Sequence, residues 1–199
     1  AAPRLAYHYQ LSGDKEKALD QYLLAGDQAR ALYAREEAGE YYQTAADLLG
    51  NKPDRRRIDL YQGWGNALFK LARYDEAVNC YQEMVNQGRR DRDSKTQAQA
   101  WLAHGKVRDR QGNFQDAIAS AEKALMFAEK GGNQEEVADS LLLQGQSHYR
   151  LGQVDQAVPL IQSALDLHRT RKDPYGEGRC LNLLGLVADV RGEFQKARK

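Results

Sequence analysis

The sequence has few of the residues that mark a disulfide scaffold, a β-sheet or a membrane span. Its two cysteines, Cys80 and Cys180, are far apart among the 199 residues and suggest no disulfide framework. Four prolines and few β-branched residues leave helix formers such as Ala, Leu, Gln and Glu dominant. The longest apolar run, residues 181–190, is interrupted by polar residues and is shorter than the ~18 residues that cross a bilayer. The composition predicts an all-α chain with no membrane partner.

The chain also lacks an excess of either charge. Lys and Arg number 29 and Asp and Glu 28, for a net charge of +1, so no long-range field draws the chain to nucleic acid or anionic lipid. Basic clusters at Arg55–Arg57, Arg89–Arg92 and Arg169–Lys172 are interleaved with aspartates and are interpreted as solvated junctions between helices. With no apolar leader at its start, the chain is expected to be cytoplasmic and to bind no nucleic acid.

Small residues recur at intervals of forty positions. One series consists of glycines and a second of alanines. Both share their period with a third series, in which Gly112, Gly152 and Gly192 each precede an apolar residue by two positions. Coincident series at one period indicate a stack of copies of one structural unit, an architecture that usually presents a binding surface. The residues of the first two series are expected to be packing residues: Gly65, Gly105, Gly145 and Gly185, then Ala77, Ala117, Ala157 and Ala197.

Each copy is predicted to be a helical hairpin. In the copy at residues 133–169, Asn133 and Glu136 form a capping-box pattern, and Gly152 ends the first helix with a left-handed residue. Gly145 and Ala157 are twelve residues apart on facing helices, where small side chains let the backbones approach. Replacing Gly145 with leucine should therefore be severe, because it overpacks the hairpin.

The chain divides into a part with regular repeats and a part in which the repeats are irregular. Residues 54–199 form a regular array with a period of about 40 and a truncated last repeat. It starts with helices at about 54–71 and 73–88, and the next copy begins at Ser94 with Gln97. Residues 1–50 are irregular but related, with helices expected at about 3–12, 15–34 and 36–49, the middle one long and bent at Gly26 and Asp27. Together they are expected to form one solenoid domain.

Three local features complete this prediction. Ala72 stands where neighbouring copies have glycine, which should make that turn less ideal, and Pro159 should kink the helix that contains it. Asp173 and Pro174 are expected to cap and begin a new helix.

The segments WLAHGKVRDRQGNFQDAIASAEKAL, LLLQGQSHYRLGQVDQAVPLIQSAL and CLNLLGLVADVRGEFQKA resemble tetratricopeptide repeats. The forty-residue period resembles the long-repeat type of kinesin light chains and Pins/LGN-like adaptors, since the usual period is ~34. The opening segment, LAYHYQLSGDKEKALDQYLLAGDQARALYAREEAGEYYQTAADLL, is similar to repeat arms of large bacterial signalling proteins. The resemblance implies an α-solenoid in which antiparallel hairpins stack into a right-handed superhelix.

The resemblance also implies a concave groove, lined by the first helix of each hairpin, that holds an extended peptide or a partner helix. The clamp that some members use for a C-terminal carboxylate is present only in fragments: Asn66 and Lys70 fit, whereas other polar or basic members are replaced by Gln62, Ala103, Asp139 and Leu143. The candidate groove residues lie on first helices, displaced from the packing glycines: Asn66, Phe69, Lys70, Lys106, Asp109, Arg110, Gln146, Tyr149, Arg150, Asn182 and Asp189.

Within that set, Lys70, Arg110 and Arg150 follow one another at steps of forty. They could form a basic ladder that binds an acidic segment through charge-assisted hydrogen bonds. The alternative is that each cation stabilises the C-terminus of its own helix against the helix dipole.

No motif indicates chemistry. The four histidines show no ligand spacing such as HExxH, and CxxC, phosphate-loop and GxSxG patterns are absent. We therefore expect no catalytic residue, no metal and no cofactor, and a scaffold or adaptor for a protein or peptide partner within a larger signalling or regulatory protein. One alternative is a sensory arm that binds a small ligand and controls an attached transcription regulator, cyclase or kinase. Another is self-association through exposed terminal repeats.

Overall fold

A computed structural model describes residues 2–50 and 54–190, which contain ten α-helices and no strand. The all-α fold class predicted from composition is confirmed. The chain forms two compact units, residues 1–92 and 93–199. The helices are α1 (Ala2–Leu11), α2 (Lys15–Ala31), α3 (Arg35–Leu49), α4 (Arg56–Lys70) and α5 (Tyr74–Arg90) in the first unit, and α6 (Ser94–Arg110), α7 (Phe114–Lys130), α8 (Gln134–Arg150), α9 (Val154–Thr170) and α10 (Pro174–Val190) in the second.

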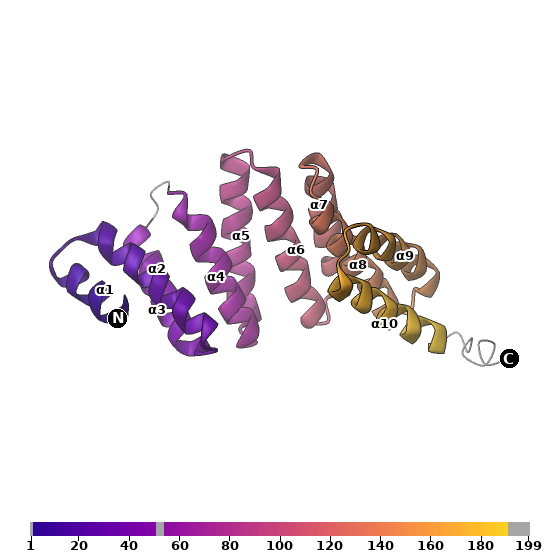
Figure 1. The fold of residues 1–199 in the computed structure, drawn as a ribbon, viewed down its shortest axis with the longest axis horizontal. Coiled ribbons are helices and arrows are strands. Elements are labelled where there is room, and N and C mark those ends of the chain that lie inside the picture. Colours follow the sequence, from indigo (N-terminus) through magenta and orange to yellow (C-terminus); the bar gives the residue numbers. More distant parts are fainter. Residues whose placement is uncertain (1, 51–53, 191–199) are drawn as a thin grey trace. The chain divides into compact units, whose positions relative to one another are not determined.

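In the first unit, each helix packs against the next one in sequence, and α2 also contacts α4 (Figure 1). Fully buried Ala18, Ala38 and Ala45 allow close approach, and Tyr42 and Leu60 fill the space between helices. The three helices expected in residues 1–50 are confirmed. The middle one, α2, is shorter than expected because the chain turns after Ala31, so it matches the later helices in length.

The second unit repeats one arrangement along its length. The hairpins α6–α7 and α8–α9 each pack internally, and the first helices α6, α8 and α10 contact one another in sequence (Figure 1). An apolar cluster joins α8, α9 and α10 through Leu142, Ile161, Leu165 and Cys180. Stacking therefore supplies the apolar cover that a single hairpin lacks.

Left-handed residues end the first helices, as expected from the glycine series. Gly112 has φ 81° and Gly152 has φ 74°, and Gly192 lies outside the described residues. The first unit makes the same turn with larger residues, Tyr33 at φ 61° and Ala72 at φ 58°. A side chain in this conformation costs roughly 1–2 kcal/mol relative to glycine, so the expectation of a less ideal turn at Ala72 is confirmed.

The predicted helix starts at Ser94, Asn133 and Asp173 are confirmed, but the capping side chain is as expected only at Asp173. Asp173 caps α10, accepting from the backbone N–H groups of Tyr175 and Gly176, and Pro174 is the first helical residue. Helix α6 begins at Ser94 as expected, and the side chain that caps it belongs to Asp93, which accepts from the backbone N–H of Lys95.

The capping box at Asn133 is wrong. The Asn133 side chain makes no capping hydrogen bond. Glu136 is buried and accepts instead from Gln99 Nε2 of α6 at 2.8 Å. Contact with the neighbouring first helix thus outweighs the local cap.

Two of the three packing glycines of the second unit, Gly105 and Gly145, lie against backbone. A Cβ on Gly145 would be 2.6 Å from Ile161 Cγ1 and 3.2 Å from the Ala157 carbonyl oxygen. A Cβ on Gly105 would lie 3.2 Å from the carbonyl oxygen of Ala117. Ala77, Ala117 and Ala157 are fully buried. Gly65 differs, since its nearest neighbour is the ring of Tyr81, at 2.7 Å.

Three further observations concern Pro159 in α9, Gly185 in α10 and the hydrophobicity of the helices. α9 continues through Pro159 from Val154 to Thr170. No described atom lies within 4 Å of a Cβ built on Gly185, and Ala197 lies outside the described residues. Within residues 2–50 and 54–190, no helix has the length and apolar character needed to cross a membrane.

Candidate partner-binding surfaces

Two aspartates, Asp109, which is buried, and Asp139, which is half-buried, join the first helices of the second unit. Asp109 of α6 is 2% exposed and accepts from Ser147 Oγ at 3.1 Å and Gln146 Nε2 at 2.8 Å, both on α8. Arg150 Nη1 lies 3.6 Å from the same carboxylate. Asp109 was predicted as a groove residue, and its side chain is occupied by these contacts between adjacent first helices.

Asp139 of α8 holds a second junction. Lys106 of α6 and Arg179 of α10 each approach its carboxylate to 3.0 Å. Burial on its own would raise the pKa of Asp139, but the two cations outweigh burial and hold the pKa below its usual value. Two of the predicted groove cations, Lys106 and Arg150, are therefore neutralised within the protein.

The remaining groove residues of the second unit have different surroundings. Arg110 is exposed at the end of α6, and Tyr149 packs against the apolar cluster of α8, α9 and α10. Asn182 and Asp189 line a cavity of about 440 Å³ on α10, together with Gly185 and Leu186. The basic ladder stays a prediction, because Lys70 belongs to the first unit and Arg150 already has a partner.

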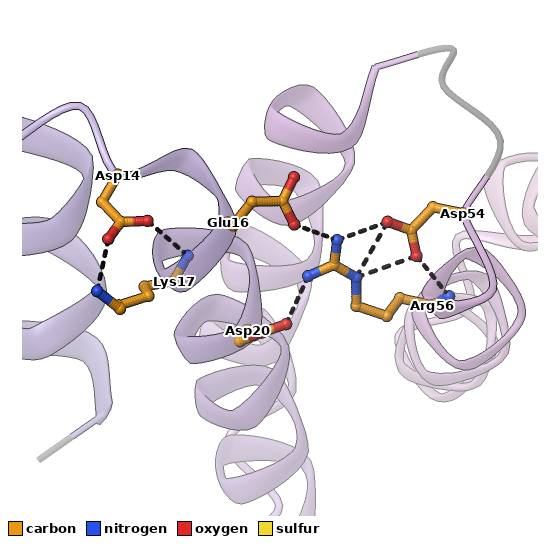
Figure 2. Close-up of polar contacts among 6 residues, drawn as sticks. All are labelled: Asp14, Glu16, Lys17, Asp20, Asp54 and Arg56. Carbon is orange, nitrogen blue, oxygen red and sulfur yellow. Dashed lines mark hydrogen bonds and ion pairs between the residues drawn. The ribbon is translucent and has the colours of Figure 1, made fainter.

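A single arginine, Arg56, links α2 to α4 in the first unit through a cluster of carboxylates. Arg56 contacts three carboxylates, Glu16 and Asp20 on α2 and Asp54 just before α4, at 2.5–2.6 Å (Figure 2). The hydrogen bond from Arg56 lowers the pKa of Asp54. The interpretation of Arg55–Arg57 as a solvated junction is wrong for Arg56 and for buried Arg57, which donates to the carbonyl oxygen of Gly50.

A cavity of about 420 Å³ lies in the first unit where α2 ends, α3 begins and α4 ends. It contains three of the predicted groove residues, all from α4. Asn66 accepts a hydrogen bond from Tyr81 at 2.8 Å, and Lys70 lies 5.9 Å from the ring centroid of Phe69. The full lining is Arg30, Ala31, Tyr33, Arg35, Asn66, Ala67, Phe69 and Lys70.

Sequence reasoning missed the members of this cavity that come from the α2–α3 turn. Arg30, Tyr33 and Arg35 lie outside the forty-residue array, so no periodicity marked them. A second cavity of similar size, about 420 Å³, is lined by other residues of α3 and α4 and by Arg73, and it carries two carboxylates, Glu36 and Glu40, against that one cation. The two cavities therefore differ in charge.

Both cysteines are buried. Burial raises the pKa of the Cys80 thiol to about 12 and that of Cys180 to about 11, so both stay protonated and are poor nucleophiles. Burial also lowers the pKa of His104 to about 4, with help from Arg108 and Lys123. Within the part of the chain that the structure describes, no group of three His, Cys, Asp or Glu side chains could hold a metal ion.

Models of the tetratricopeptide repeat family match residues 56–130 and 142–199, about two thirds of the chain. The repeated hairpins, the packing glycines and these matches agree, and the chain belongs to the tetratricopeptide repeat family. Proteins of this family are generally binding modules without catalytic activity.

One curated relative is aryl-hydrocarbon-interacting protein-like 1 from Bos taurus, which is 43% identical over 49 residues. That match covers 25% of this chain and 15% of the relative. It therefore reflects shared repeats over a short segment.

Solved structures of low sequence identity share the fold. The apo form of RapI has a TM-score of 0.82 at 13% identity, over 90% of this chain and 66% of that one. A Rap conjugation gene regulator in complex with the Phr* peptide has a TM-score of 0.63 at 18% identity, over 92% and 56%. A signal-transduction ATPase with a tetratricopeptide repeat sensor, from Pyrococcus horikoshii, has a TM-score of 0.71 at 16% identity, over 81% and 26%. The chain thus spans about half to two thirds of the Rap proteins and a quarter of the ATPase.

Proposed function

We propose that this chain is a non-catalytic protein-interaction scaffold that binds a peptide or a partner helix along its first helices, as part of a larger signalling or regulatory protein. The observation that carries the proposal is the cavity in the first unit, to which α4 contributes Asn66, Phe69 and Lys70. These residues were selected for their position on a first helix. A fold shared with a Rap regulator in complex with a peptide supports the same kind of ligand.

The proposal is tested by selecting peptides from an unbiased display library against the whole chain. Hydrogen exchange with and without the enriched peptide then locates the binding surface. We expect added protection in the first helices α2, α4, α6, α8 and α10, and little change in α3, α5, α7 and α9. Failure to enrich any peptide, or protection confined to the second helices, would refute groove binding.

The second candidate is a sensory arm that binds a small ligand and controls an effector domain. Its support is the fold shared with the signal-transduction ATPase that has a repeat sensor, together with a cavity of about 420 Å³, a size typical of small-ligand pockets. Thermal unfolding in the presence of a metabolite library separates the two candidates. A stabilising metabolite without any enriched peptide would favour the sensory arm.

A further inference from the structure

The cavity at the α2–α3 turn carries charge of one sign. Arg30, Arg35 and Lys70 line it, and no carboxylate does. A concave surface lined by like charges concentrates the electrostatic potential and attracts ions of opposite sign. Convergence of like charges also raises the free energy of the empty cavity, and a bound anion relieves that cost.

Arg30 and Lys70 are exposed and Arg35 is half-buried, and none of the three has the close carboxylate partner that other cations of the chain have. Arg56, Lys106 and Arg179 each lie within about 3 Å of a carboxylate. Among the described residues, Arg35 and Lys70 have no carboxylate partner. Arg30 has only long contacts of 3.4 Å, to Asp27 and to the hydroxyl of Tyr42. Two cations are therefore available, and a third is weakly held.

Tyr33 adds an apolar wall at a local cost. It adopts the left-handed conformation that Gly112 and Gly152 adopt at the corresponding turns of the second unit. Its side chain is 80% exposed, so packing in the first unit does not offset the backbone strain. Phe69 provides a second ring in the same cavity.

We propose that this cavity recognises an acidic peptide segment in which two carboxylate side chains flank an apolar one. The carboxylates pair with Arg35 and Lys70, and the apolar side chain lies between the rings of Tyr33 and Phe69. The inference rests on the proposed peptide-binding function and assigns the chemistry of the peptide. Arg35 supplies a planar fork of donors suited to a carboxylate.

A protein segment fits better than a nucleic acid. Three cations at one cavity are few for a backbone that carries a charge on every nucleotide, and the chain as a whole has a net charge of only +1. The other cavity on the same helices carries Glu36 and Glu40 against a single cation, Arg73, so its net negative charge would repel a polyanion extending beyond the site.

The test is fluorescence anisotropy of the whole chain at low ionic strength with a dye-labelled peptide in which two glutamates flank a leucine. A peptide with glutamines in place of the glutamates is the matched ligand. We expect the acidic peptide to bind at least tenfold more tightly. Arg35→Glu should weaken its binding about tenfold, equal to ~1.4 kcal/mol. Because a glutamate in the first turn of α3 favours the helix dipole, that variant should keep its stability.

Controls separate local from general charge effects. Arg4→Glu makes the same charge change in the first turn of α1, away from the cavity, and should leave affinity within twofold. Tyr33→Gly should weaken binding at least threefold without lowering the unfolding temperature. Equal affinity for the acidic peptide and its glutamine counterpart, or equal effects of Arg35→Glu and Arg4→Glu, would overturn the assignment.

The library selection distinguishes failure of this inference from failure of the proposed function. Enriched acidic peptides that lose affinity in Arg35→Glu support the inference. Enriched peptides that are not acidic, that require phosphorylation, or that are insensitive to Arg35→Glu overturn it while peptide binding stands. Displacement of the acidic peptide by a single-stranded oligonucleotide at equal concentration would also overturn it. If no peptide is enriched, both proposals fail.

Discussion

Substitution of Gly145 by alanine tests the packing argument at its tightest point. A helix interior normally gains about 1 kcal/mol from this change. Here the new methyl group would lie 2.6 Å from Ile161 Cγ1 and 3.2 Å from the backbone carbonyl oxygen of Ala157. A side-chain rotation cannot move that carbonyl, so α8 and α9 must separate, at a typical overpacking cost of ~2–3 kcal/mol. We expect a net loss of about 1–2 kcal/mol in the free energy of unfolding.

Gly178→Ala is the matched control. Gly178 lies within α10 of the same unit, and nothing lies within 4 Å of its Cβ position. That variant should therefore gain roughly 0.5–1 kcal/mol from propensity alone. Urea unfolding followed by circular dichroism should separate the two variants by about 1.5–3 kcal/mol, the sum of these effects. If Gly145→Ala proves as stable as Gly178→Ala, close approach of the two helices is not why glycine occupies position 145.

Three polar groups give further predictions. Asp139→Asn should destabilise the chain by about 1–3 kcal/mol at neutral pH, because Lys106 and Arg179 lose their shared anion; since the folded pKa is lowered, the difference from the natural chain in urea unfolding should shrink as pH falls below ~4. Arg56→Gln should cost about 1 kcal/mol, and a loss that does not diminish with salt would contradict an ionic link. His104, with a pKa of about 4, should show no imidazole titration by NMR between pH 5 and 8, and the natural chain should lose stability relative to His104→Gln as pH falls from ~6.5 toward 4.

Much of the fold was predictable because backbone conformation leaves a local signature. Gly112 and Gly152 mark left-handed turns directly, since few other residues adopt that conformation at low cost. Asp173 followed by proline likewise predicts a helix start from adjacent residues. The capping box predicted at Asn133 was wrong because the Glu136 side chain hydrogen-bonds to Gln99, on another helix, and this contact could not be predicted from adjacent residues.

The candidate site was less predictable, because its composition depends on which helix faces which. Asp109 has a suitable position for a groove residue, yet its carboxylate is occupied by residues one period further along the chain. Opposite charges about forty positions apart, such as Glu16 and Arg56, could have predicted ion pairs between neighbouring first helices. Arg35 and Tyr33 gave no such signal, because the first repeats depart from the regular spacing and only the turn after α2 brings them to the end of α4.

The spacing of these cross-helix contacts has a consequence for how the chain reaches its native state. Within each unit, the described helices pack on the next helix or the next but one, and the polar pairs between first helices join residues 33 to 41 positions apart. No segment must search the whole chain for its partner, so the entropy lost in closing each loop stays small and nearly constant along the sequence. Folding can start at any hairpin and spread outward, at a rate set by local encounters. A hairpin emerging during synthesis could thus be packed before the following one is complete.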